Sequence, residues 1–355
     1  MRIALLASNI DSIPPLGNGG TEQVVSLLAD ALVESGHDVT LFGAGDSRTQ
    51  AKLASVHDTA LRSDRNVRVQ DWPAYEMRSL IKLQEMQDQF DVVHNHMGYQ
   101  ALPAMASLNT PHVTTVHEPI RPFCAPIYLK YSHLPYVAIS EASKKLNYGD
   151  KLNYQTVIYN GISVGEFLSE NTLDSASGQA RKYLLFLGRI CRDKGTMEAI
   201  EIARKLALPL IIAGKLDQAD EPYFRTYVEP YLEPGKIDFI GEVDYSKKLD
   251  LFGGAIAVLY PIAVDEPFGI VMAEAMASGT PVLALDRGAV REVLIDTKTA
   301  VIGKSVGELI TRFGEIALID PKNCQLRALE MFSVEKMTAR YEKLYQALMR
   351  ARNIA

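Results

Sequence analysis

Two carboxylates stand on either side of a short turn in the stretch DEPFGIVMAEAMASGTPV, residues 265–282. Glu266 comes directly before the turn, and Glu274 follows it within a predicted helix, with seven residues between the two acids. The first N–H groups of a helix have no partner inside it and can bind an anion. Here these groups belong to Phe268, Gly269 and Ile270. Carboxylates accept hydrogen bonds from hydroxyls, so the stretch predicts a ligand with both hydroxyls and phosphates. Alternatively, the acids only pair with the helix dipole.

A second candidate site is the loop GRICRDKG, residues 188–195, which follows a predicted strand. Arg189 and Lys194 flank this loop, and the chain then passes Gly195 into a helix. Two cations beside a helix N-terminus suit a diphosphate. The alternative is solvated charge on a loop. Because the loop lies at the carboxyl end of a strand, we favour the diphosphate clamp.

Two other candidates follow predicted strands nearer the N-terminus. His117 ends the strand at residues 112–117, where an imidazole can hydrogen-bond a substrate hydroxyl. A single histidine is, however, more often a packed or solvated residue. Gly19 and Gly20 open a helix, so bare backbone can approach a phosphate there, or the two glycines simply make a flexible helix start.

The histidines His94 and His96 raise the question of a metal. They could form a zinc pair in principle, but no third ligand follows at a suitable spacing. No metal site is therefore expected.

The elements that position these residues are predicted from hydrophobic periodicity. Short apolar runs alternate with helical stretches along the whole chain, which is typical of parallel sheets covered by helices. The first group of predicted strands comprises residues 2–8, 38–43, 91–94, 112–117, 136–140 and 156–160. The second group comprises residues 182–188, 208–214, 236–241, 255–261 and 280–286.

A small and polar stretch, residues 168–180, separates the two groups and predicts a linker. The fold class is therefore α/β, with two Rossmann-like domains whose parallel sheets face a central cleft. The predicted domains are residues 1–168 and 181–330, and residues 331–355 form a final helix. Sheets of this kind bind ligands beyond the carboxyl ends of their strands, where the candidate residues lie.

The composition of the 355 residues limits the possible functions. A net charge of −6 argues against sequence-independent nucleic-acid binding, which needs an excess of Lys and Arg. The three cysteines are far apart in the sequence and suit a reducing cytoplasm. No signal peptide or transmembrane segment is predicted, although peripheral membrane contact is compatible with the sequence.

Two of these motifs resemble signatures of a known family. GRICRDKG and EPFGIVMAEAMASGTPV are similar to sequences of the retaining family 4 glycosyltransferases, which have the GT-B fold. The second motif resembles the E-x7-E signature of that family. PPLGNGGTEQVV, DVVHNHMGY and TTVHEP in the first half also have counterparts in it. The resemblance covers nearly the whole chain and is closest to the branch named after the avilamycin-pathway glycosyltransferase.

The resemblance implies a role for each candidate. His117 and Glu266 would be the catalytic residues, both in contact with the transferred sugar. The first domain would bind the acceptor, the second would bind the donor, and the last helix would return to the first domain. The implied donor-binding residues, besides the turn at 268–270, are Gly19, Gly20, Arg189, Lys194 and Glu274.

The expected activity is transfer of a hexosyl group from a nucleoside-diphosphate sugar with retention of configuration. A UDP-linked hexose is expected as donor, over GDP-mannose or an ADP-sugar. The acceptor, whether sugar, lipid or natural product, is not encoded in a readable way. No Asp-x-Asp triplet occurs in the sequence, so cations and helix dipoles would stabilise the leaving group without a metal, and no cofactor is expected.

Two other functions are compatible with the sequence. A nicotinamide-dependent oxidoreductase shares the sheet pattern, but it needs a tight glycine fingerprint that is missing after residue 8. A non-catalytic protein that binds nucleotide sugars could use the same scaffold, because fold alone does not fix function.

Overall fold

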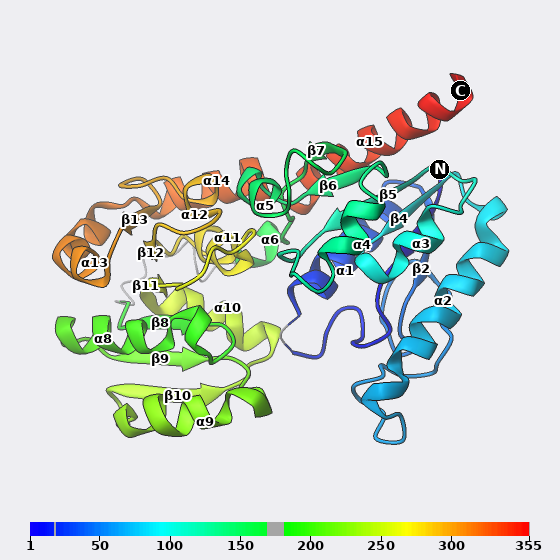
Figure 1. The fold of residues 1–355 in the computed structure, drawn as a ribbon. Coiled ribbons are helices and arrows are strands. Elements are labelled where there is room, and N and C mark those ends of the chain that lie inside the picture. The colour runs from blue at the N-terminus through cyan, green and yellow to red at the C-terminus, as the bar shows by residue number, and fades with distance from the viewer. Residues whose placement is uncertain (18, 169–180, 355) are drawn as a thin grey trace. The chain divides into compact units, whose positions relative to one another are not determined.

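The computed structural model describes residues 1–17, 19–168 and 181–354 (Figure 1). The chain divides into two compact units. Unit 1 combines Met1–Gly161 with Val334–Ala355, and unit 2 is Ile162–Ser333. The predicted linker, residues 168–180, lies outside the described residues apart from Leu168.

Unit 1 is built on a seven-stranded parallel sheet with the order β3-β2-β1-β4-β5-β6-β7. The central strands are almost entirely buried, as their continuous apolar runs require. The strands are β1 (Arg2–Leu6), β2 (Asp38–Phe42), β3 (Lys52–Leu53), β4 (Val92–Asn95), β5 (His112–Val116), β6 (Tyr136–Ala138) and β7 (Tyr154–Val157).

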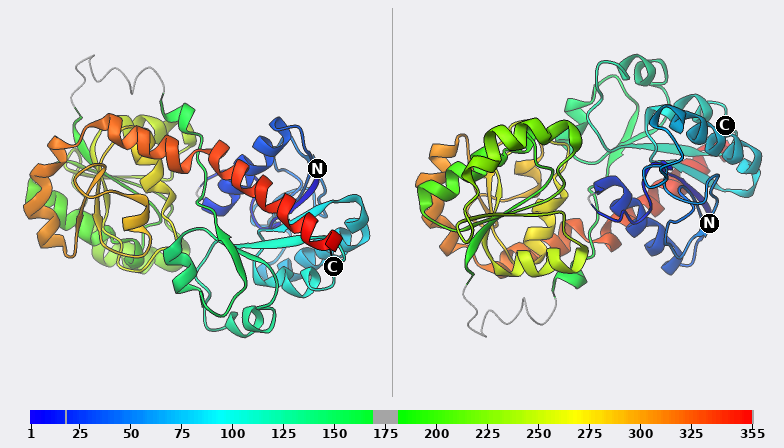
Figure 2. Two further views of the ribbon diagram at one scale, coloured as in Figure 1. Left: turned by 90° about the horizontal axis from the view of Figure 1, so that it is seen from above. Right: turned by 90° about the horizontal axis from the view of Figure 1, so that it is seen from below.

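Helices cover both faces of this sheet, because right-handed crossovers that proceed in opposite directions from β1 leave their helices on opposite sides. One face carries a large apolar core with side chains from α2, α3 and α4. On the other face α1 packs against α15, and Figure 2 shows these two helices side by side. The helices are α1 (Gly20–Glu34), α2 (Trp72–Met86), α3 (Leu102–Met105), α4 (Ala125–Lys130), α5 (Glu141–Leu146) and α15 (Val334–Ile354).

Unit 2 has a six-stranded parallel sheet with the order β10-β9-β8-β11-β12-β13. Its strands are β8 (Tyr183–Leu187), β9 (Leu210–Ala213), β10 (Ile237–Gly241), β11 (Ala255–Tyr260), β12 (Val282–Leu285) and β13 (Ala300–Gly303). Around this sheet α8 packs against α13, and α11 packs against α14 and α6. The helices are α6 (Val164–Phe167), α8 (Thr196–Leu206), α9 (Glu221–Tyr223), α10 (Tyr245–Gly254), α11 (Ile270–Ala277), α12 (Val290–Val293), α13 (Val306–Arg312) and α14 (Pro321–Phe332).

The two Rossmann-like parallel sheets confirm the predicted α/β fold class with two parallel-sheet domains. The strand predicted at residues 156–160 is wrong by about two residues, since β7 spans Tyr154–Val157. This edge strand is largely exposed and lacks the apolar run by which buried strands are recognised. Two further strands, β3 and β13, were not predicted from the sequence. Within the described residues, no helix combines the length and apolarity that crossing a membrane would require.

Candidate functional site

The order of the strands explains which loops lie together in each unit. In both sheets the order in which successive strands are added reverses at a central pair of neighbours. This pair is β1 and β4 in unit 1, and β8 and β11 in unit 2. Ligands of such sheets bind beyond the carboxyl ends of the strands at this reversal. In unit 2, the Lys194 loop follows β8 and Glu266 follows β11.

The carboxylate of Glu266 joins these two loops of unit 2. Lys194 Nζ donates to Glu266 Oε1, and the hydroxyl of Tyr260 donates to Glu266 Oε2. Tyr260 ends β11 and is buried, which raises the pKa of its hydroxyl well above the usual value and keeps it a donor. The side chains of Lys194 and Glu266 remain 30% and 23% exposed. A cation and a carboxylate therefore lie together, within reach of a ligand.

Two glycines allow the backbone to approach the end of β11 closely. Gly195 has φ +78°, and a Cβ there would lie 2.0 Å from the carbonyl oxygen of Pro261. Gly269 has φ +82°, and a Cβ there would lie 2.5 Å from the hydroxyl of Tyr260. Only glycine adopts this left-handed backbone without strain. A side chain at position 195 would push its loop away from the end of β11, and one at position 269 would displace the hydroxyl of Tyr260.

Glu274 lies inside α11 and has a different partner. Its side chain is only 5% exposed, and Lys248 Nζ of α10 donates to its Oε1 at 2.5 Å. The ammonium of Lys248 also lies 4.9 Å from the ring centre of Tyr245. A nearly buried carboxylate is stable as an ion only when it is paired in this way. Glu274 and Lys248 thus form a second charged pair beside the first.

The turn before α11 presents backbone rather than side chain. Phe268 is buried and packs edge-on against Phe332, with 5.5 Å between the ring centres. Gly269 is the N-cap residue of α11 and Ile270 is its first residue. The predicted anion site at these N–H groups stays a prediction.

Arg189 and Lys194 do not contact a common group in the structure. The guanidinium of Arg189 lies 3.8 Å from the carboxylates of both Asp217 and Asp220. Lys194 bonds Glu266 instead. A diphosphate held by both cations would have to compete with these carboxylates, so the clamp also stays a prediction.

In unit 1, His117 follows β5 and is hydrogen-bonded to another histidine. Its Nε2 lies 2.8 Å from Nδ1 of His96, which follows β4. The ring of His96 packs on His94, with 3.9 Å between the ring centres. Burial lowers the pKa of His117 to about 4 and lowers those of His94 and His96 well below the usual value. All three imidazoles are therefore neutral at pH 7.

The start of α1 is covered by an acidic side chain. A Cβ at Gly19 would lie 2.8 Å from Oε2 of Glu22, whose pKa is raised by burial. Gly20 is the first residue of α1. A phosphate could approach the backbone of Gly19 and Gly20 only if the Glu22 side chain moved away or lost its negative charge. Their predicted role is untested.

Among the residues described, no three His, Cys, Asp or Glu side chains come together in a way that would hold a metal ion. Both ring nitrogens of His94 are already hydrogen-bonded, to Tyr345 and Thr115. The zinc pair considered for His94 and His96 therefore has no support in the geometry. The metal-free reaction stays a prediction.

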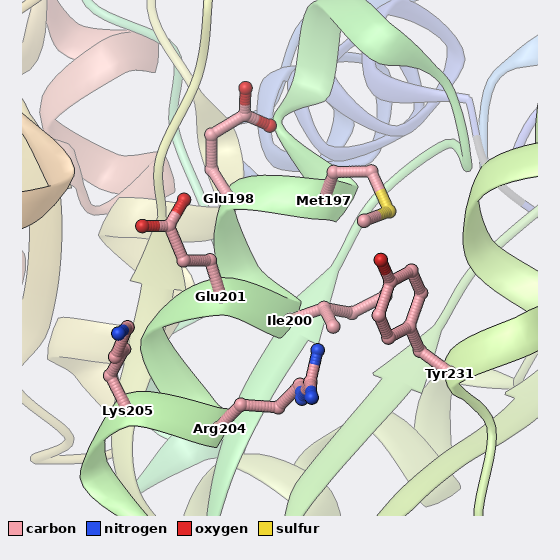
Figure 3. A pocket seen from close by; sticks show the side chains of 7 residues that line it. All are labelled: Met197, Glu198, Ile200, Glu201, Arg204, Lys205 and Tyr231. Atoms are coloured by element: carbon pink, nitrogen blue, oxygen red, sulfur yellow. The ribbon is translucent and has the colours of Figure 1, made fainter.

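Unit 2 also has a hollow of about 510 Å³ along α8, apart from the residues predicted to act (Figure 3). Met197, Ile200 and Tyr231 supply its apolar lining, and the Arg204 guanidinium lies 5.0 Å from the ring centre of Tyr231. None of the predicted site residues lines it.

Sequence reasoning missed three contacts of the candidate residues: Lys248, Tyr260 and His96 in its role beside His117. Tyr260 and His96 lie at or next to the carboxyl end of a strand, so their position was a usable signal. Lys248 lies within a helix among other charged residues, and nothing in the sequence distinguishes it.

Comparison with known proteins agrees with this geometry. Residues 18–166 match the family described as Glycosyltransferase Family 4, and residues 170–313 match Glycosyl transferases group 1. The chain is 26% identical over 316 residues to a phosphatidyl-myo-inositol mannosyltransferase of Mycolicibacterium smegmatis, covering 83% of this chain and 79% of that protein.

Solved structures give the same result for the fold. A glycosyltransferase involved in avilamycin A biosynthesis has a TM-score of 0.73 and 25% identity, covering 99% of this chain and 98% of its own. Anabaena HepE in complex with UDP-glucose has a TM-score of 0.75 and 16% identity, covering 98% of this chain and all of its own. The chain therefore belongs to the family 4-like glycosyltransferases of the GT-B fold, and it is a hexosyltransferase.

Proposed function

We propose that the protein transfers a hexosyl group from a nucleoside-diphosphate sugar, UDP-linked in preference to GDP- or ADP-linked, to a hydroxyl of an acceptor. The reaction retains the anomeric configuration and needs no metal. The observation that carries this proposal is the contact of Lys194 with Glu266 at the strand reversal of unit 2. A cation, which suits a phosphate, thus lies beside a carboxylate, which suits sugar hydroxyls.

Each candidate site residue of unit 2 has a role in this reaction. Lys194 and Arg189 bind the diphosphate and stabilise the negative charge that grows on it as the glycosidic bond breaks. Glu266 accepts hydrogen bonds from the transferred sugar, and Tyr260 holds that carboxylate in place. Glu274, further along α11, accepts hydrogen bonds from the ribose.

Support for the donor comes from the relatives. HepE was solved with UDP-glucose, which fits a UDP-sugar, although at 16% identity the likeness extends only to the fold. The mannosyltransferase relative acts on a phosphatidyl-inositol, which adds lipids of that kind to the acceptors to be tried. The absence of an Asp-x-Asp triplet from the sequence supports transfer without a metal.

The test begins with thermal shifts of the protein in UDP-, GDP- and ADP-sugars. We expect a UDP-sugar to give the largest stabilisation, Lys194→Ala to lose it, and Lys205→Ala, on the exposed face of α8, to keep it. The best donor is then incubated with sugar and phosphatidyl-inositol acceptors in EDTA, and the product anomer is assigned by proton coupling. We expect transfer with retention.

Three outcomes would contradict the proposal. Activity that disappears in EDTA and returns with Mg²⁺ would exclude the metal-free reaction. An inverted product would exclude retention. Donor binding without transfer to any acceptor would favour a protein that only binds nucleotide sugars.

A further inference from the structure

The pair of histidines in unit 1 is asymmetric. His96 is only 5% exposed, and its Nδ1 faces Nε2 of His117 at 2.8 Å. The second ring nitrogen of His96, Nε2, is buried and has no hydrogen-bond partner. Nδ1 of His117 is bonded by no group in the part of the chain that the structure describes, and this residue is partly exposed. The pair therefore has a buried nitrogen on one side, Nε2 of His96, and on the other side Nδ1 of the partly exposed His117, which we call the open nitrogen.

The protonation of the pair follows from its hydrogen bond. A neutral imidazole carries one N–H and one bare nitrogen. Burial lowers the pKa of both rings, so both are neutral at pH 7. One nitrogen of the contact must then donate and the other must accept. Two arrangements satisfy this condition, and they place opposite chemistry at the open nitrogen of His117.

The unpartnered nitrogen of His96 selects between the two arrangements. If His96 Nε2 carried the proton, a buried N–H would have no acceptor. If His96 Nδ1 carries it, only a bare acceptor is left unsatisfied. Among buried backbone groups, an N–H without an acceptor is rarer than an under-satisfied acceptor, and we apply the same preference to the imidazole. This preference favours a proton on Nδ1 of His96, from which the ring donates to Nε2 of His117.

We propose that His96 is a positioning residue that fixes His117 in the tautomer with the proton on Nδ1. This inference rests on the proposed function and on the role that the family resemblance implies for His117, which is contact with the transferred sugar. The open nitrogen of His117 then donates a hydrogen bond to a sugar oxygen. It does not accept a proton, so His117 acts as an orienting donor rather than as a general base.

The residues packed behind the pair hold the His96 ring in this orientation. His94, which packs on His96, is held by the hydroxyl of Tyr345 at its Nδ1 and by Thr115 at its Nε2, each at 2.7 Å. With both nitrogens engaged, the His94 ring is fixed and limits rotation of the His96 ring against it. His96 therefore keeps its Nδ1 directed at His117.

The test uses ¹⁵N-labelled protein and long-range ¹H–¹⁵N spectra of the imidazoles at pH 7.5, with His117→Gln to assign the His117 signals. We expect a protonated Nδ1 and a bare Nε2 at His117. His96→Asn places an amide N–H near the original Nδ1 and should preserve this tautomer. His96→Leu, which has no donor, should leave His117 as a mixture of tautomers.

Kinetics separate positioning from a purely structural role. His96→Asn should keep kcat within about threefold of the parent, whereas His96→Leu should lower kcat at least tenfold with little change in free UDP affinity. A wild-type His117 protonated on Nε2, or a His117 tautomer unchanged in His96→Leu, would overturn the inference. If His96→Leu does not fold, the spectra of the wild type and of His96→Asn test the inference, because both must show His117 protonated on Nδ1. The spectra need no donor, so they succeed or fail separately from the proposed function.

Discussion

The two acids of the E-x7-E motif differ in what surrounds them. Glu266 is partly exposed and shares its carboxylate between Lys194 and Tyr260. Glu274 is nearly buried and faces Lys248. Neither acid relies on the helix dipole for compensation, because each has a lysine of its own. A simple dipole-pairing role therefore does not explain the pair.

This difference gives a prediction for the two isosteric amides. A ribose contact is equal in the ground state and the transition state, so Glu274→Gln should raise KM for the donor roughly tenfold or more. A contact with the reacting sugar strengthens as charge develops, so Glu266→Gln should mainly lower kcat. Steady-state kinetics and the affinity for free nucleotide measure both effects.

Two results would contradict this division of roles. One is an unchanged nucleotide affinity in Glu274→Gln, and the other is a full kcat in Glu266→Gln. Because Glu274→Gln leaves Lys248 with a neutral partner, its folding is checked by thermal melting before its kinetics are compared.

Among the helices and strands of unit 1, α15 is the element that lies far from the others in the sequence. Met337, Tyr341 and Tyr345 form its buried side. The hydroxyl of Tyr345 lies 2.7 Å from Nδ1 of His94, 251 residues earlier. About one turn before Tyr345, Glu342 pairs with His37, the residue before β2, at 2.9 Å. The helix is therefore part of the unit 1 core and supports the histidines behind His117.

Tyr345→Phe tests this support. Removal of the hydroxyl leaves His94 Nδ1 buried without a partner, which should cost about 1–3 kcal/mol of unfolding free energy. Urea unfolding followed by the fluorescence of Trp72, the single tryptophan, reports on unit 1. Tyr131→Phe, at a partly exposed tyrosine of the same unit, is the control and should change little. Equal unfolding midpoints for both variants would show that the contact between Tyr345 and His94 does not stabilise unit 1.

At the scale of the whole molecule, we expect the buried histidines to make unit 1 less stable against unfolding at acidic pH. His94, His96 and His117 have pKa values below the usual 6.5 in the folded state. Below pH 6.5 the unfolded chain therefore binds more protons than the folded chain, and stability falls as the pH decreases toward 4, the pKa of His117. Burial raises the pKa values of Glu22 and Glu76, and these acids act in the opposite direction.

A comparison of wild type with His96→Asn isolates the contribution of one histidine. Between pH 7.5 and pH 5.5 the wild type should lose more unfolding free energy, by up to about 1.4 kcal/mol per pH unit below the ordinary pKa. Urea unfolding with Trp72 fluorescence at several pH values measures the slopes. Parallel slopes for the two proteins would mean that His96 takes up protons equally in the folded and unfolded states.

The sequence alone determined the features that depend on local geometry. Buried parallel strands read as short apolar runs, so the central strands and the two sheets were predictable. The turn before α11 and its two acids were recognisable because a helix start needs particular residues at fixed spacing. The two-residue β3 and the exposed β7 carry too little apolar signal to be placed in this way.

Which of these residues meet depends on how the strands and helices pack together. Lys194 reaches Glu266, 72 residues away, because β8 and β11 are neighbours in the sheet. His96 and His117 are hydrogen-bonded because β4 lies beside β5, and Tyr345 reaches His94 because α15 packs on the same sheet. Strand order is set by the packing of whole elements around a core, which no local pattern of residues records.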